Sequence, residues 1–189
     1  MTVIHHTRWL CQLLLITVCL TWQGNLYAVT LEELRLSVGS KLFPTMLAAD
    51  LHIKDKQGAD GALQLLVIYQ HSPHSAAIIA EKLTTVSNVK KMPLRITPTA
   101  LKKLTGADIG QIGGIFVAEP LHDNLSEVLA FARTRKVMVF SPFEGDVELG
   151  AHGGISVRDR ILPYINPGAL RADDIKLKAF FIKVAVQYD

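Results

Sequence analysis

Two histidines three residues apart, His71 and His74, are the first residues whose types and spacing could carry chemistry. Side chains at this spacing on one helix could share a metal ion, and a serine beside them could act as a nucleophile. However, Ser72 followed by Pro73 is typical of a helix N-cap and a first helical residue, which places His71 before the helix. No H-E-x-x-H spacing supplies further ligands. We therefore predict a helix start here and no metal site.

Glu119, His122 and Asp123 form a second polar group, with the residue types of an acid, a base and an orienting carboxylate. Polar residues are also expected wherever a loop leads into a helix, so we predict a solvated loop here. A third segment, Ser141–Asp146, is rich in turn-forming residues. We expect its Phe143 either at the surface, as an anchor for a partner, or buried over the end of a sheet.

The chain has no established catalytic signature. Its glycine-dense stretches, 110–114 and 150–154, match neither the P-loop nor the dinucleotide-binding fingerprint, and the G-x-S-x-G elbow is absent. We predict a protein that is not an enzyme and has no cofactor or metal, with a hydrolase using His74 or His122 as the alternative. The residues expected to contact a ligand or a partner are Gln70, His71, Ser72, His74, Glu119, His122, Ser141 and Phe143.

Strand and helix patterns alternate between residues 63 and 140, and each of the three polar loops follows a predicted strand. Strands are expected at 63–69, 94–96, 114–118 and 137–140, and the first and third of them are expected to be buried. Helices are expected after Ser72 to about Val86, from Thr97-Pro98 to Gly106, and after Asn124 with Glu127 as its capping-box partner. This alternation predicts a mostly parallel sheet with helices on its faces, and the three loops at its carboxyl edge.

The two ends of the chain differ from this alternating region. A helix capped by Thr30 is expected to kink or end at Pro44, and the polar residues 54–61 predict an exposed loop. The expected C-terminal elements are a β-hairpin of 154–157 and 161–165, a short helix from Asn166-Pro167 and a last amphipathic helix at 177–188. Together these patterns predict a single-domain α/β three-layer sandwich, with a mostly parallel sheet and a C-terminal β-hairpin and helix.

Residues 1–28 have the layout of a secretory signal peptide. A weakly basic start is followed by an apolar run at 10–20 and a polar end at Ala28. As a helix this run would be about 16 Å long, against about 30 Å of bilayer hydrocarbon, so an uncleaved anchor is the less favoured alternative. Cleavage would leave residues 29–189, which contain neither Cys nor Trp. We expect an exported domain in a bacterial periplasm, with no direct membrane insertion.

The charge of the chain argues against one class of partner. Of 189 residues, 20 are basic and 17 acidic, for a net charge of +3, and no run of like charges exceeds two. Nucleic-acid-binding proteins usually carry a basic stripe or patch, so nucleic acid is not an expected partner.

The last third of the chain carries an ordered set of motifs. A Gly-Gly strand at 152–157 precedes a strand ending in Ile165-Asn166, a short Ala-rich helix at 169–172 and an apolar end. Together with the upstream strands at 114–118 and 137–141, this order resembles the YfiR-type family of small periplasmic proteins. The resemblance covers roughly residues 63–188.

This resemblance implies a regulator that binds the periplasmic domain of an inner-membrane diguanylate cyclase and restrains it. Cyclic-di-GMP signalling and biofilm formation would then be controlled from outside the cytoplasm. The oligomeric state of the regulator is left open, with a homodimer as one alternative. The alternative is drawn from the polar loops 70–74 and 141–146. It is a periplasmic module that binds or senses a small solute.

Overall fold

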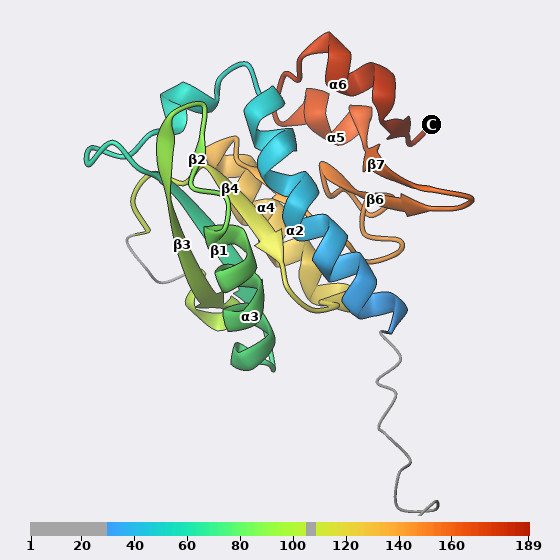
Figure 1. Cartoon of the computed structure of the whole chain (residues 1–189), viewed down its shortest axis with the longest axis horizontal. Coiled ribbons are helices and arrows are strands. Elements are labelled where there is room, and N and C mark those ends of the chain that lie inside the picture. The colour runs from blue at the N-terminus through green and yellow to red at the C-terminus, as the bar shows by residue number, and fades with distance from the viewer. Residues whose placement is uncertain (1–29, 105–108) are drawn as a thin grey trace, which may run out of the picture. The chain divides into compact units, whose positions relative to one another are not determined.

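The apolar run Leu63–Tyr69 forms strand β1, near the middle of the sheet (Figure 1). The computed structural model describes residues 30–104 and 109–189, and within them the sheet has eight strands in the order β2-β3-β1-β4-β5-β6-β7-β8. The other strands are β2 (Asn88–Val89), β3 (Met92–Ala100), β4 (Gly114–Val117), β5 (Met138–Phe140), β6 (Gly153–Val157), β7 (Ile161–Ile165) and β8 (Val186–Gln187).

The sheet is mostly parallel, as the alternating pattern predicts. Strands β3, β1, β4, β5 and β6 pair with one another in parallel, and β7 and β8 also pair in parallel. Among the described strands, antiparallel pairing is confined to the β2–β3 hairpin and the predicted C-terminal hairpin, in which Val157 pairs with Ile161. The carboxyl ends of β1, β4, β5 and β6 therefore lie at one edge of the sheet.

Helices cover both faces of the sheet, which confirms the predicted three-layer α/β class. Helices α2 and α3 lie on one face and α4 on the other, while α5 and α6 lie beside the β6–β7 hairpin (Figure 1). The α-helices are α2 (Leu31–Ala49), α3 (Pro73–Thr84), α4 (Leu125–Arg135), α5 (Pro167–Ala172) and α6 (Ala179–Val184). Three 3-10 helices are η1 (Ile53–Lys56), η2 (Leu101–Lys103) and η3 (His122–Asn124).

The core has two parts because successive residues of a strand point to opposite faces. Leu65 and Val67 of β1 pack with α2 and α3, whereas Leu66 and Ile68 pack with α4. These four side chains are at most 1% exposed. A strand buried on both faces needs a continuous apolar run, which is the pattern that residues 65–69 have.

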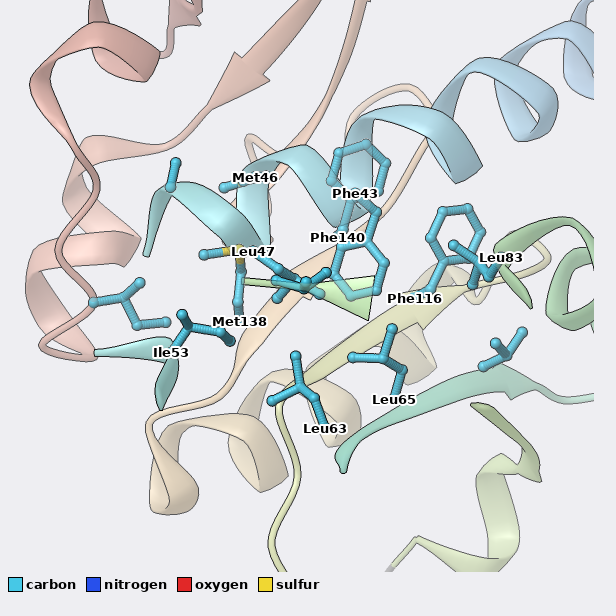
Figure 2. Close-up of a cluster of buried hydrophobic side chains, with 14 of the residues drawn as sticks. Phe43, Met46, Leu47, Ile53, Leu63, Leu65, Leu83, Phe116, Met138 and Phe140 are labelled. Carbon is cyan, nitrogen blue, oxygen red and sulfur yellow. The ribbon is translucent and has the colours of Figure 1, made fainter. Parts of the chain in front are cut away.

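Three phenylalanines, labelled in Figure 2, and a glycine set the distance between α2 and the sheet. The ring centroids of Phe43, Phe116 and Phe140 are 5.7 Å apart in each pair. Gly114 lies directly beneath α2, and a Cβ there would come within 2.8 Å of both Phe43 and Leu47. Only glycine allows this approach, so Gly114 has a packing role.

Pro44 does not end α2, since the helix continues to Ala49. Proline has no N–H to donate to the carbonyl four residues earlier, here that of Ser40. Phe43, Met46 and Leu47 lie on both sides of Pro44 in the helix, and each is at most 1% exposed. Burial of these side chains against the sheet outweighs the lost hydrogen bond.

The predicted helix start at Thr97-Pro98 is also wrong. Strand β3 continues through both residues to Ala100, and only the 3-10 helix η2 follows it. Pro98 is opposite Val67 of β1, while β2 pairs only with Met92 and Pro93. Beyond Pro93 strand β3 is therefore an edge of the sheet, where a proline without N–H is tolerated.

Two predictions near helix ends need correction. Asn124 precedes α4, but its side chain makes no capping bond and instead donates to Gln70. The last helix ends at Val184 rather than continuing to residue 188, because Val186 and Gln187 form β8 beside β7. Pairing with a sheet edge replaces the end of the amphipathic helix. The predicted signal peptide and Gly106 lie outside the described residues.

No helix in residues 30–104 and 109–189 is long and apolar enough to cross a membrane.

Candidate functional site

The first two predicted loops meet where the strand order reverses. From β1 the chain moves to β3 on one side, and it then returns to β4 on the other side of β1. Gln70–Ser72 follows β1, and Glu119 comes two residues after β4. In open α/β sheets ligands bind at such a point, outside the carboxyl ends of the strands.

A side chain of the protein itself fills this position. The Glu119 carboxylate accepts hydrogen bonds from the backbone N–H groups of Gln70, His71 and Ser72, the last two at 2.5 and 3.0 Å. The Glu119 side chain is only 13% exposed, and the His71 Nδ1 atom is 3.7 Å from its Oε1. A carboxylate is stabilised in this place by the positive end of the α3 dipole. Glu119 therefore joins two loops and is not placed as a free acid.

Ser72 is the N-cap of α3, as predicted. Its Oγ accepts a hydrogen bond from the Ser75 N–H at 3.1 Å and lies 2.7 Å from the Ser75 Oγ. His74, in the first turn of α3, and His122, in η3, are both exposed. In the described part of the chain, no group of three or more His, Cys, Asp or Glu side chains could hold a metal ion.

Ser141 and Phe143 of the third loop are both buried, so Phe143 covers the end of the sheet and is not an exposed anchor. The Ser141 hydroxyl donates to Asp146 at 2.5 Å and accepts from the Phe143 N–H at 3.3 Å. Burial raises the pKa of the Asp146 carboxyl. These bonds give the loop a fixed shape, which positions Phe143 in the wall of a cavity.

This cavity, of about 160 Å³, opens at the carboxyl ends of β5 and β6. Arg35 reaches it from α2 with a side chain only 10% exposed, and it is held by the Pro142 carbonyl at 3.2 Å and the Glu144 carboxylate at 3.0 Å. The lining residues are Arg35, Phe143, Glu144, Gly145, Glu148, Ile155, Ser156, Val157, Arg158 and Tyr164.

The cavity presents charges of both signs. Glu148 accepts a hydrogen bond from the Tyr164 hydroxyl at 3.0 Å, and burial and this carboxylate raise the pKa of Tyr164. Arg158, at the start of the β6–β7 turn, makes no ion pair within residues 30–104 and 109–189. Since Glu144 is paired with Arg35, the arrangement leaves the Arg158 guanidinium and the Glu148 carboxylate available to a small polar molecule.

Sequence reasoning identified Phe143 but missed the charged lining. Arg158 was assigned only to a hairpin turn, and its place at the site depends on β6 being parallel to β5. Glu148 falls just beyond the predicted loop, and Arg35 is more than 100 residues away from it in sequence. The one available signal was the position of Arg158 immediately after a strand.

Two larger hollows, of about 400 and 540 Å³, lie at the opposite, amino-terminal edge of the sheet. Most of their charged side chains are bonded to one another. Lys56 binds Asp50 at 2.8 Å, and Lys136 binds Asp174 at 3.0 Å. This pairing leaves them less suited to a charged ligand than the cavity at the carboxyl edge.

A buried polar group that the sequence did not reveal lies behind β5 and β6. His152 is 0% exposed, and its Nδ1 accepts the Val139 N–H at 2.9 Å. Its Nε2 therefore carries the proton and donates to Asp173 at 2.9 Å, and the other Asp173 oxygen accepts from Arg133 at 2.8 Å. Burial lowers the pKa of His152, and the Asp173 carboxylate opposes that effect.

No family model matches the chain, and no curated protein matches it. Several solved structures share its fold. A substrate-binding protein with adhesive properties from Clostridium difficile, in its ligand-free open form, superposes with a TM-score of 0.51 at 15% identity, over 74% of this chain and 58% of that chain. A conserved domain protein from Vibrio cholerae superposes with a TM-score of 0.52 at 14% identity, over 73% and 59% of the two chains.

A third structure, an ABC domain from Streptococcus pneumonia in complex with L-Trp, has a TM-score of 0.47 at 9% identity, over 75% of this chain and 61% of that one. In each case the match spans about three fifths of the other protein. At these identities the first two structures show a likeness of fold alone.

Proposed function

We propose that this chain is a binding or sensing module for a small polar solute, and that the solute binds in the cavity lined by Arg35, Glu148 and Arg158. The observation that carries the proposal is this cavity itself, which lies at the carboxyl edge of a parallel sheet and presents unpaired charge. A similar fold in a substrate-binding protein supports the same function. We further propose that the module is exported by residues 1–28.

The charges indicate the kind of solute. A volume of about 160 Å³ corresponds to roughly five water molecules at ~30 Å³ each, so the solute is small. Arg158 would bind an acidic group, and Glu148 would bind a cationic one. A zwitterion with both groups, of the size of a small amino acid, complements the site better than an ion of one sign or a neutral sugar.

A thermal-unfolding screen tests this function. Small amino acids are compared with acetate, ammonium and neutral sugars on the purified chain. A zwitterion at 100 times its Kd should stabilise the folded state by about 2.7 kcal/mol, because it binds the folded state alone. A flat response to every zwitterion would contradict the proposal.

A second candidate function is the regulator that the YfiR-type resemblance implies. The observation in its favour is apolar surface near the C-terminus. Phe180 and Val184 lie one turn apart on α6 and are 56% and 57% exposed, and Tyr188 is 41% exposed. Exposed apolar groups that cluster in this way are typical of protein contacts. The partner would be the periplasmic domain of an inner-membrane diguanylate cyclase.

Crosslinking in cells tests this second candidate. The wild type should capture a membrane cyclase. The double variant F180S and V184S should give at least about tenfold less crosslinked product, since exposed aromatic side chains dominate such contacts. L149S, which changes a 66% exposed leucine in the segment between β5 and β6, is the matched control. Deletion of the gene should also raise cyclic-di-GMP. An unchanged level and no captured membrane protein would contradict this function.

A further inference from the structure

A second, apolar pocket lies among the C-terminal elements, apart from the cavity proposed for the polar solute. It has a volume of about 230 Å³ and lies between α5, α6 and the paired strands β7 and β8. Four of its lining residues are at most 8% exposed. They are Ile165, Leu170, Ile175 and Leu177, and the lining is completed by Pro167, Ile182, Arg171, Lys176 and Gln187.

Two cations are the only charged residues in this lining. Arg171 makes no ion pair within the described ranges 30–104 and 109–189. Lys176 is 3.6 Å from a carboxylate oxygen of Asp174, whose other oxygen binds Lys136 at 3.0 Å. Both cations are exposed, and no acidic residue lines the pocket.

Hydrogen bonds between backbones hold the walls of the pocket in place. The segment that carries Lys176 and Leu177 is joined to the end of α2, since the Leu51 N–H donates to Lys176 and the Lys178 N–H donates to Ala49, both at 2.9 Å. On the opposite side the Tyr188 N–H donates to Ile165 at 2.9 Å. A pocket built in this way needs little reorganisation to bind a ligand.

We propose that this pocket binds a short monocarboxylic acid, with the apolar tail among Ile165, Leu170 and Ile182 and the carboxylate between Arg171 and Lys176. Guanidinium and ammonium groups form strong, charge-assisted hydrogen bonds with carboxylates, and the apolar walls offer nothing to a polar tail. The volume equals that of seven to eight water molecules at ~30 Å³ each, which suits a six-carbon acid. This inference does not depend on the proposed polar solute.

Titration of the full chain with hexanoate, followed by amide NMR, tests the proposal. Hexanoate should shift the signals of residues 165–187 with a Kd below about 10 mM, and 1-hexanol and hexylammonium should bind at least about tenfold more weakly, because they lack the carboxylate. R171Q combined with K176Q should weaken hexanoate binding by at least about tenfold. K183Q, which changes an exposed lysine of α6 outside the pocket, should leave the Kd within about twofold.

Three results would overturn the proposal. They are no shift in this region, equal binding of hexanoate and hexanol, and an unchanged Kd in the double variant. A dimer that forms through this pocket and persists in saturating hexanoate would assign it to a second copy of the chain, which also overturns the proposal. The R158Q variant distinguishes the two sites, because it should weaken binding of the polar solute and leave hexanoate binding unchanged.

Discussion

At the scale of single residues, the buried polar side chains of this protein hold loops in place. Glu119 has the residue type of a catalytic acid, but three backbone N–H groups surround its carboxylate. Ser141 likewise bonds to Asp146 within its own loop. These groups give the carboxyl edge a fixed shape, and the charges of Arg158 and Glu148 remain available at the cavity.

His152 predicts how stability depends on pH. Its pKa is lowered by burial in the folded state, whereas an unfolded histidine titrates near 6.5. Below pH 6.5 the unfolded chain therefore binds more protons at this position, and the folded state loses stability as pH falls. The stability that depends on a neutral His152 is fully present above pH 6.5. Below that pH the free energy of unfolding falls by at most about 1.4 kcal/mol per pH unit, the value for one proton.

Urea unfolding of the wild type and H152Q between pH 8 and 5 measures this effect. Glutamine keeps an oxygen for the Val139 N–H and an N–H for Asp173, but it does not titrate. H152Q should be less stable at pH 8, and its stability should fall less steeply below pH 6.5 than that of the wild type. H122N, which changes an exposed histidine, is the control. Parallel pH curves for the wild type and H152Q would contradict the account.

At the scale of elements, local sequence signals predicted helix starts, helix ends and strands correctly where tertiary packing agreed with them. The cap of α3 formed as predicted, with Ser72 followed by Pro73. A helix end at Pro44 and a helix start at Pro98 did not form, because α2 is held by its buried face and β3 continues along β1. Neither contact is visible in the residues next to the prolines. Asn124 failed as a cap because its amide bonds to Gln70 on a different loop.

Two alanine variants distinguish the cap that forms from the one that does not. S72A removes the hydrogen bond to the Ser75 N–H, so it should lower the free energy of unfolding by about 1 kcal/mol. N124A removes only a bond between two side chains at the surface, so it should cost less than about 0.5 kcal/mol. Chemical denaturation measures both changes. A larger loss for N124A than for S72A would contradict the assignment of the caps.

At the scale of the whole molecule, the fold class, the sheet direction and the edge that carries the loops were predictable from apolar runs and turn residues. The cavity was not, because it combines Arg35 near the start of the described chain with Glu148 and Arg158 from two later segments. Parallel pairing of β5 and β6 brings the latter two together, and α2 adds the first. The proposed binding site is therefore formed only by tertiary packing.

Calorimetric titration of the chain with the zwitterion that stabilises it most tests this central claim directly. One site per chain is expected, and R158Q should raise the Kd at least about tenfold, because it removes the cation that binds the acidic group. R160Q changes an exposed arginine in the same turn, outside the cavity lining, and should leave the Kd within about twofold. An unchanged Kd in R158Q, or an equal loss in R160Q, would contradict the assignment of the solute to this cavity.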